Sequence, residues 1–330
     1  MVSRIMQNAE LTITVGMPVC NAMPWLPEAM ESLLSQTVRD FPILAIVDGG
    51  DDGSAAYLRS LRLPQLRVIE QPHAGVTATL NRLLLEACTP WLVRMDADDV
   101  SYPARIETLL DAIGQFPGAG LIYSFADYHP RERCAGQFRC SRGSAEELHS
   151  IVERGYLLSI CHPTVALNVE KAQAVGAYRM DLHAEDADLW WRMARRFEIR
   201  CIPQALVGFR QTEQSVSTRH LEDQQLNALY VQYLLLSDLW SLPPHPLSDV
   251  SAVLRGFLNP DAVQAKDWLR RCNMHLARRQ RWRAATALAR SAYASPRYLA
   301  GRLRDEIRKT AIANGVAPRR FLERKEALWA

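Results

Sequence analysis

The segment WLVRMDADDVSYPARIETLL, residues 91–110, places three carboxylates within four positions at the end of an apolar run. Asp96, Asp98 and Asp99 repel one another at neutral pH, so we expect a positive partner at this point. A divalent cation is one candidate, because hard cations prefer carboxylate oxygens. The alternative is a helix cap, since these acids precede a periodic apolar segment in which Pro103 suits the first turn. This segment alone leaves both interpretations open.

Strand-like and helical segments alternate over the first hundred residues. The helical stretches 27–36 and 79–88 place leucines on one face. The β-rich runs, each ending in turn or polar residues, are 11–18, 41–50, 66–70 and 91–96. A further strand is expected at 120–128. This repetition of strand and helix predicts an α/β fold, in which helices cover a parallel sheet.

Polar residues follow three of these predicted strands. Asn21, Asp48 and the acids from Asp96 to Asp99 stand at or just past strand carboxyl ends. Because ligands of such sheets bind at that edge, we expect these side chains to converge on one crevice. Asn21 has a second interpretation, as the cap of the helix at 27–36.

A second acidic segment, HAEDADLWWR at 183–192, opens a predicted helix at 185–197. One interpretation is electrostatic, because Glu185, Asp186 and Asp188 suit the positive end of the helix dipole. The other is catalytic, because a carboxylate near a sugar hydroxyl can take its proton as a bond to an electrophilic carbon develops.

Eight segments in collinear order together resemble the family-2 glycosyltransferases of the GT-A fold, over about residues 11 to 217. They are MPVCN (17–21), SLLSQT (32–37), AIVDGGDDGS (45–54), HAGVTATLN (73–81), RMDADDVSYPARIE (94–107), CHPTVALNVEKAQAVGAYR (161–179), AEDADLWWRMA (184–194) and ALVGFRQTEQSVS (205–217). Each motif is weak alone, but eight in register are specific.

The resemblance implies a Rossmann-like, mostly parallel sheet flanked by helices. It implies an inverting, hexosyltransferase-type enzyme that takes a sugar from a nucleotide-diphospho-sugar, most often a UDP-sugar. It further implies Mg²⁺ or Mn²⁺ as the cofactor, a saccharide or lipid-linked saccharide as the acceptor, and a role in bacterial cell-surface polysaccharide or glycolipid synthesis.

The nucleotide-binding positions of the family are carried over by motif. Pro18 and Asn21 match the loop that lines the nucleotide pocket. Asp48 matches the start of the acidic motif that recognises the base, although Gly49 stands where a second Asp is usual. Further nucleotide-sugar contacts are implied at His73, Gly75 and Asn81.

The catalytic positions are carried over in the same way. Asp96 and Asp98 match the D-x-D motif, with Asp98 as the best metal ligand and Asp96 near the ribose or donor sugar as well as the metal. Asp186 matches the catalytic base, and Glu185 is its acidic neighbour. Arg210 matches a basic position that approaches the diphosphate.

Two rival functions remain at this stage. A nucleotidyltransferase on a similar sheet also needs acids and a metal, but it does not need the acidic helix at 185–197. A degenerate transferase acting as a binding subunit is the second rival, because Gly49 departs from the usual acidic motif. Turnover of nucleotide-sugars with and without metal separates the three.

The charge of the chain is unevenly distributed. From residue 261 onward, 17 Lys and Arg stand against 6 Asp and Glu, whereas the first 260 residues carry 22 and 30. The basic tail has three interpretations: amphipathic helices packed on the main domain, attachment to an anionic membrane, or nucleic-acid binding. Nucleic acid is disfavoured, because no recognised module accompanies the charge.

We therefore expect two regions. Residues 1–219 form the GT-A domain, with a nucleotide-sugar half at about 1–100 and an acceptor half at about 101–219. Residues 220–330 form a helical, basic region, in which SLPPHPLSD (241–249) is a linker or hinge.

Composition points to a soluble cytoplasmic protein. Of 330 residues, 48% are hydrophobic and 23% charged, and no apolar run approaches the roughly 18 residues of a membrane helix. We find no apolar leader segment near the start. Seven scattered cysteines without a C-x-x-C pair argue against a disulfide framework and a zinc site, so we expect most to be buried as small hydrophobes.

Overall fold

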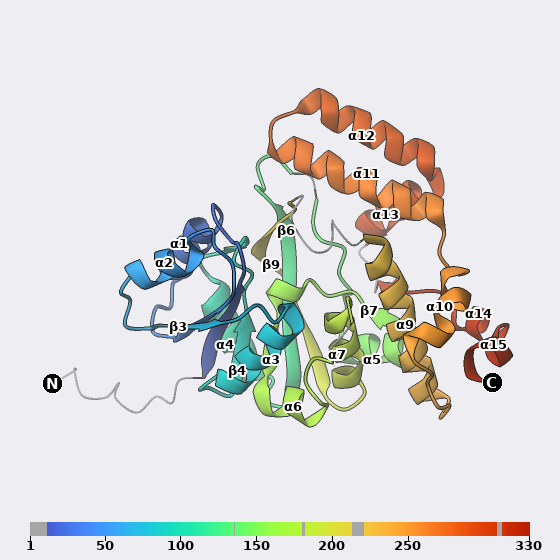
Figure 1. Ribbon diagram of the computed structural model, residues 1–330, viewed down its shortest axis with the longest axis horizontal. Helices are drawn as coiled ribbons and strands as arrows, with labels where there is room; N and C mark the ends of the chain where they lie inside the picture. Colours follow the sequence, from blue (N-terminus) through green and yellow to red (C-terminus); the bar gives the residue numbers. More distant parts are fainter. Residues whose placement is uncertain (1–11, 135, 180–181, 213–220, 309–311) are drawn as a thin grey trace.

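The computed structural model describes residues 12–134, 136–179, 182–212, 221–308 and 312–330. One mixed sheet of eight strands, in the order β3-β2-β1-β4-β8-β6-β9-β5, forms its centre (Figure 1). The strands are β1 Ile13–Val19, β2 Ile43–Asp48, β3 Leu66–Gln71, β4 Trp91–Arg94, β5 Val100–Ser101, β6 Ala119–His129, β8 Ala166–Asn168 and β9 Glu198–Arg210.

The sheet is mostly parallel, as expected. β1 pairs in parallel with β2 and β4, β2 with β3, and β6 with β9. β8 lies antiparallel between β4 and β6, and β5 pairs antiparallel with the end of β9. All six residues of β2, ILAIVD, are buried, which is typical of a parallel strand covered on both faces. The carboxyl ends of β1, β2 and β4 therefore meet at one edge.

Helices cover both faces of the sheet and form its two apolar layers. Met30 of α1 and Leu109 of α4 belong to one layer, whereas Leu83 of α3 and Leu189 of α7 belong to the other. The helices of this half are α1 Leu26–Leu34, α2 Ser54–Ser60, α3 Val76–Glu86, α4 Arg105–Gln115, α5 Ala145–Glu153, α6 Val169–Ala174 and α7 Glu185–Ala194, with a 3-10 turn η1 at His162–Thr164.

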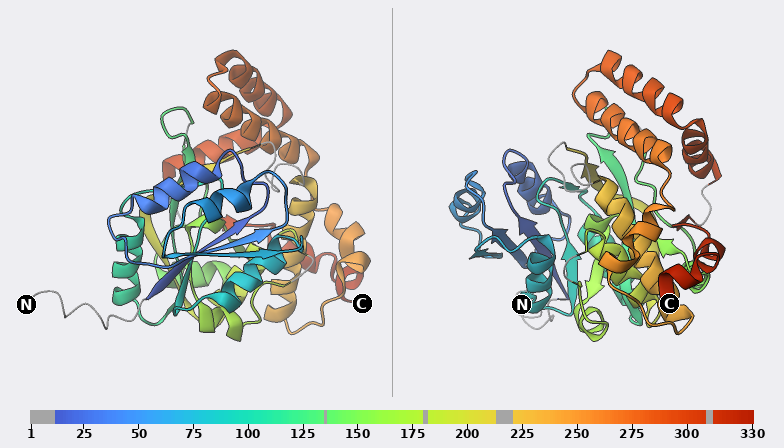
Figure 2. Two further views of the ribbon diagram at one scale, coloured as in Figure 1. Left: turned by 60° about the vertical axis from the view of Figure 1, so that its left-hand side comes forward. Right: turned by 45° about the vertical axis from the view of Figure 1, so that its right-hand side comes forward.

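The C-terminal part is helical with one short strand. Its elements are α9 Leu221–Leu239, α10 Leu247–Arg255, α11 Pro260–Ala277, α12 Arg281–Ala294, α13 Pro296–Arg308, β10 Ala313–Asn314, α14 Pro318–Leu322 and α15 Lys325–Trp329. Figure 2 shows α11 and α12 side by side, projecting beyond the sheet. The predicted boundary at residue 219 lies outside the described residues, and the division into two domains stays a prediction.

The last described segment returns to the first half of the chain. β10 pairs antiparallel with β7, Leu157–Leu158. Nearby, Trp329 stacks against Tyr233 of α9 at a centroid distance of 4.7 Å. The short strand was not foreseen, because two residues carry no periodic pattern. Within the described residues, no helix has the length and apolar character needed to cross a bilayer.

Two predicted helix caps are wrong. α4 begins at Arg105 after Ala104, without a side-chain cap, so the acids after β4 do not cap it and Pro103 precedes its first turn. α1 begins after Trp25, and Asn21 instead accepts a hydrogen bond from the Asp51 amide at 3.2 Å. The prediction of buried cysteines is also wrong for most of them, since only Cys140, Cys161 and Cys272 are buried.

Candidate active site

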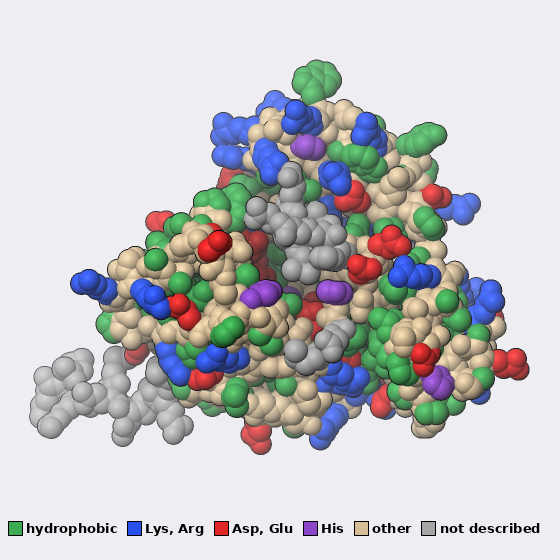
Figure 3. Space-filling view, viewed as in Figure 1, with side chains coloured by type: hydrophobic (Ala, Val, Ile, Leu, Met, Phe, Trp, Pro, Cys, Tyr) green, Lys and Arg blue, Asp and Glu red, His purple; other side chains and the backbone are tan. Residues whose placement is uncertain are grey.

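The three acids after β4 form a compact oxygen cluster. One carboxylate oxygen from each of Asp96, Asp98 and Asp99 lies within 4.8 Å of the others. Arg94, the last residue of β4, is buried and forms an ion pair with Asp96. Figure 3 shows acidic and histidine side chains gathered in a central hollow of this face. Because these acids do not cap α4, the capping interpretation is wrong, and a metal-binding role for their carboxylates stays a prediction.

Two of these carboxylates carry charge that the protein compensates poorly. Burial, followed by the negative charge of Asp96, raises the pKa of Asp98 to about 7. Burial and the two neighbouring acids raise the pKa of Asp99 well above its usual value. Asp99 accepts the Arg210 amide at 2.7 Å through Oδ1, but its buried Oδ2 has no hydrogen-bond partner among the described residues. The cluster is therefore suited to a cation.

Arg210, at the end of β9, anchors the loop that carries these acids. Its Nε donates to the Asp98 carbonyl at 2.7 Å, and its guanidinium lies over the Trp25 ring at 4.4 Å. The same guanidinium pairs with Glu28 of α1. Arg210 therefore lies beside the loop of Asp96 to Asp99 with its charge paired to Glu28, and its approach to a diphosphate stays a prediction.

Glu185 and Asp186 open α7 next to the cluster. Burial and the charge of Asp186 raise the pKa of Glu185 to about 8. Burial also raises the pKa of Asp186, while the Ala187 amide, which donates to Oδ1 at 2.7 Å, and the Arg94 charge oppose that rise. For both acids, the charge of Arg94 lowers the pKa and the charge of Asp96 raises it. The two acidic segments predicted from the sequence therefore face one site.

Asp188 serves the fold and not the site. It is fully buried and forms an ion pair with Arg192 at 2.7 Å, and its Oδ1 accepts the Trp191 indole N–H at 3.2 Å. The electrostatic interpretation of the acidic helix start therefore does not describe Asp188, whose partners are side chains.

Asp48 organises the turn that holds His73 and Gly75. Its carboxylate accepts the Ala74 amide at 2.8 Å and the Gly75 amide at 2.9 Å. His73 Nδ1 lies 3.1 Å from the same carboxylate, and its ring is exposed. Asp48 is buried, so any contribution of Asp48 to base recognition would act through this turn.

The departure at Gly49 has a conformational reason. Its φ of +68° favours glycine, and a Cβ there would lie 3.0 Å from the His73 Cβ. An aspartate at this position would therefore be strained. The nearby acids Asp51 and Asp52 are both exposed, and Asp52 accepts the Met23 amide at 2.7 Å and the Ser54 amide at 3.0 Å.

The remaining predicted nucleotide contacts differ in their surroundings. Pro18 lies near the end of β1 and is partly buried, and Asn21 is exposed with a φ of +48°. Asn81 lies in α3, where its side chain bonds both backbone groups of Tyr178, at 2.8 Å and 2.9 Å. The Asn81 amide thus holds a segment 97 residues away, and a direct contact with the donor stays a prediction.

The sequence interpretation missed the buried groups beneath the acids. Arg105 donates to the carbonyls of Arg94 and Pro163, both at 2.6 Å. His162 bonds the Tyr178 hydroxyl at 2.9 Å, and burial followed by the Arg94 charge lowers the His162 pKa well below its usual value. A charged residue inside the apolar run of β4 was the available signal for Arg94.

Asp98→Asn is expected to stabilise the metal-free protein at alkaline pH. The pKa of Asp98 in the folded protein, about 7, lies above its ordinary value. The free energy of unfolding is therefore undiminished by this group below about pH 4 and falls as pH rises to about 7. The amide escapes that loss. Each kcal/mol relieved should raise Tm at pH 8 by about 2–4 °C.

Thermal melts of wild type and variant between pH 4 and 8 measure this difference. The difference should shrink toward pH 4, and the exposed Asp111 of α4 supplies the matched control, Asp111→Asn. A lower Tm for Asp98→Asn at pH 8 would contradict the assignment of uncompensated charge to this carboxylate.

Solved structures share this fold. Staphylococcus aureus TarS 1–349 in complex with UDP-GlcNAc matches with a TM-score of 0.54 at 12% identity, covering 86% of this chain and 91% of that one. The mannosyltransferase PcManGT from Pyrobaculum calidifontis, in complex with GDP-Man and Mn²⁺, matches with a TM-score of 0.52 at 16% identity, covering 90% and 81%. The chain therefore has the GT-A fold.

Sequence comparison places the chain more narrowly. Residues 14–139 match the model for Glycosyl transferase family 2. The putative glycosyltransferase EpsE of Bacillus subtilis (strain 168) is 25% identical over 200 residues, which are 56% of this chain and 67% of EpsE. The amylovoran biosynthesis glycosyltransferase AmsE of Erwinia amylovora is 28% identical over 204 residues, 59% and 73%. The chain therefore carries a family-2 glycosyltransferase domain, which the family model places at residues 14–139.

Other curated glycosyltransferases are matched only in part. The uncharacterised glycosyltransferase YibD of Escherichia coli (strain K12) is 33% identical, over 32% of this chain and 31% of YibD. Matches to two further glycosyltransferases span 21% and 17% of their length. These matches span less than two thirds of each relative, so they identify neither the acceptor nor the donor sugar.

Proposed function

We propose that the protein is an inverting, metal-dependent glycosyltransferase, moving a sugar from a nucleotide-diphospho-sugar to an acceptor hydroxyl in cell-surface polysaccharide synthesis. The donor we favour is a UDP-sugar. The observation that carries the proposal is the convergence of two acidic segments, Asp96 to Asp99 and Glu185 with Asp186, around the buried Arg94. A nucleotidyltransferase would need only the first of these segments.

The residues after β4 fit a hard divalent cation. Three carboxylates supply oxygen atoms within 4.8 Å, and one buried oxygen of Asp99 lacks a hydrogen-bond partner among the described residues. Asp98 would be the principal ligand, with Asp96 beside it. Mg²⁺ or Mn²⁺ would neutralise charge growing on the departing diphosphate.

Asp186 would act as the general base. It takes the proton of the acceptor hydroxyl while the oxygen forms a bond to the anomeric carbon. The bond from that carbon to the diphosphate oxygen breaks on the opposite face, so the configuration inverts and the nucleoside diphosphate leaves with the bonding electrons.

Glu185 would support this step by holding a proton. Its pKa of about 8 keeps it protonated at neutral pH, while the Ala187 amide favours the charged form of Asp186. One proton shared by two adjacent acids leaves one carboxylate free to act as base.

A screen of nucleotide-sugars tests the function. UDP- and GDP-sugars are offered with Mn²⁺, with Mg²⁺ and with a chelator, and release of the free nucleoside diphosphate is measured. We expect metal-dependent release from one donor class. Release of pyrophosphate from a nucleoside triphosphate would instead support the nucleotidyltransferase, and binding without turnover would support the degenerate transferase.

We further propose that the basic C-terminal region rests on an anionic membrane surface, where a lipid-linked acceptor would lie. α12 packs on α11 through buried Ala284 and Ala287. Its other face leaves Trp282 and Tyr293 exposed at 88% and 92%. Figure 3 shows hydrophobic side chains protruding among Lys and Arg at the top of the molecule, where α12 lies. Aromatic and basic groups together suit a lipid headgroup layer.

The double variant Trp282→Ala, Tyr293→Ala is expected to lose most of its binding to vesicles of anionic lipid. Flotation of the full chain measures this, because removing the tail would also remove the stacking of Trp329 on Tyr233. Leu85→Ala, an exposed leucine on α3, is the matched control. If the double variant and the control float equally, the membrane proposal is contradicted and α12 serves only to pack against α11.

A further inference from the structure

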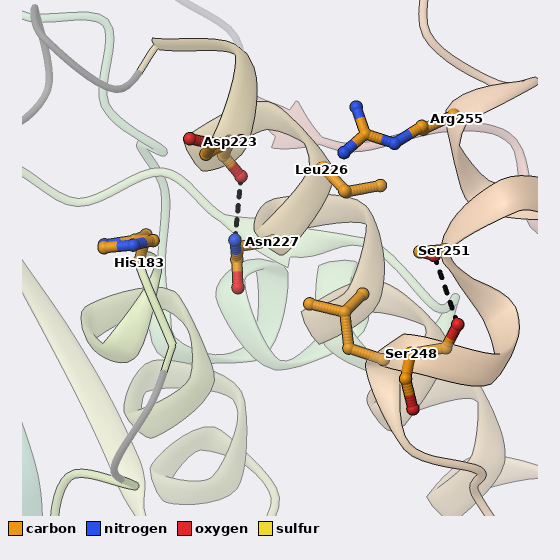
Figure 4. A pocket seen from close by; sticks show the side chains of 8 residues that line it. His183, Asp223, Leu226, Asn227, Ser248, Ser251 and Arg255 are labelled. Carbon is orange, nitrogen blue, oxygen red and sulfur yellow. Dashed lines mark hydrogen bonds between the residues drawn. The ribbon is translucent and has the colours of Figure 1, made fainter.

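A pocket of about 440 Å³ opens where α9 and α10 meet the loop before α7 (Figure 4). This volume lies within the range of small-molecule sites. A second cavity, of about 600 Å³, lies between α5 and the end of α7, on residues that take no part in the acidic site. The first pocket is of interest because one of its lining residues, His183, lies just before the helix that carries the proposed base, Asp186.

The pocket combines an apolar floor with hydrogen-bonding walls. Leu226 and Leu247 contribute the apolar part. Asn227 is only 5% exposed, and its amide nitrogen donates to the Asp223 carbonyl at 2.8 Å. In Figure 4 the amide oxygen of Asn227 points away from that bond. Ser251 adds a hydroxyl from α10 that donates to the Ser248 carbonyl at 3.3 Å, so the oxygens of Asn227 and Ser251 act as acceptors beside a small apolar patch.

The position of the pocket ties it to the reaction. His183 lines the pocket and precedes Glu185 by two residues. Two residues of extended chain span at most about 7 Å, so a ligand in the pocket lies close to the start of α7. The opposite wall comes from α9 and α10, which lie beyond the part of the chain that the family model covers.

The geometry points to this pocket as the subsite for the saccharide part of the acceptor, an inference that rests on the proposed function. A pyranose ring presents hydroxyl groups at its rim and C–H groups on its face. The amide of Asn227 and the hydroxyl of Ser251 match the rim, and the two leucines match the face. A saccharide held there would lie beside the segment that leads into Asp186, and acceptor choice would be set by α9 and α10.

Ligand-observed NMR tests the subsite with methyl pyranosides of glucose, galactose, mannose and N-acetylglucosamine as probes. We expect saturation transfer to at least one of them in wild type. Ser251→Leu should reduce it several-fold by filling the pocket, and Asn227→Leu should do so by removing the amide. Ala252→Leu, exposed on the same helix, adds the same side chain outside the pocket and should leave it unchanged.

Calorimetry with UDP and GDP separates this inference from the proposed function. If neither nucleotide binds, the proposed transferase function is overturned. Saccharide binding to the pocket is still decided by the NMR experiment. The subsite is overturned if no pyranoside shows saturation transfer in wild type. It is equally overturned if both pocket variants keep the wild-type signal while circular dichroism shows them folded.

Discussion

Asp186→Asn is expected to lower sugar transfer by about 10²-fold or more while nucleotide and metal binding stay near wild type. An amide keeps the shape of the side chain but cannot take the acceptor proton, and a lost general base costs about this much. Because burial raises the pKa of Asp186, wild-type transfer should fall as pH drops, at a pH above the usual range of an aspartate. The variant should lose this acidic limb.

Glu185→Gln is the matched control for the base. Glu185 immediately precedes Asp186 in the first turn of α7. Its pKa of about 8 keeps it protonated at neutral pH, so replacing it with an amide changes its charge little. We expect a much smaller loss than for Asp186→Asn. If Glu185→Gln abolishes transfer and Asp186→Asn retains it, the two roles must be exchanged.

Asp98→Ala is expected to abolish the metal-dependent part of nucleotide binding. Among the described residues the Asp98 carboxylate forms no ion pair, whereas Arg94 pairs with Asp96 and the Arg210 amide bonds Asp99. Without its oxygen, Mn²⁺ should no longer tighten the binding of UDP. Calorimetry with and without Mn²⁺ measures the ratio of the two dissociation constants for UDP. We expect this ratio to fall by about tenfold or more in the variant, that is, by about 1.4 kcal/mol.

Asp111→Ala removes an exposed carboxylate of α4 and controls for the change in net charge. It should leave the Mn²⁺ effect intact. An unchanged Mn²⁺ effect in Asp98→Ala would overturn the assignment of this residue as a metal ligand, and the search would move to Asp99 and its unpartnered oxygen.

The parts of the site that follow strand ends were predictable from sequence. Asp48 and the acids after β4 stand where apolar runs stop, and parallel pairing brings such ends to one edge. The acidic start of α7 was visible in the sequence with two interpretations, and only the family resemblance selected Asp186 as the base, because the approach of this segment to Arg94 depends on tertiary packing.

Other features could not be predicted because they depend on long-range contacts. Asn81 looks like a polar residue near a ligand loop, yet its amide is bonded to Tyr178. Likewise, a charged residue in a strand suggests an exposed edge, whereas Arg94 is buried against Asp96. The partner of Asn81 lies 97 residues away, and the burial of Arg94 depends on the strands that flank β4, so neither environment has a local sequence pattern.

The pairing of β10 with β7 has a consequence for the order of assembly during synthesis. Ala313 pairs with Leu158, so about 155 further residues must be synthesised after Leu158 before that pair can form. The sheet from β1 to β4 has all its strands within the first hundred residues and can assemble while the ribosome is still translating. The hydrogen bonds between Gln232 of α9 and Val316, which follows β10, likewise form only near the end of translation, so α9 gains this support last.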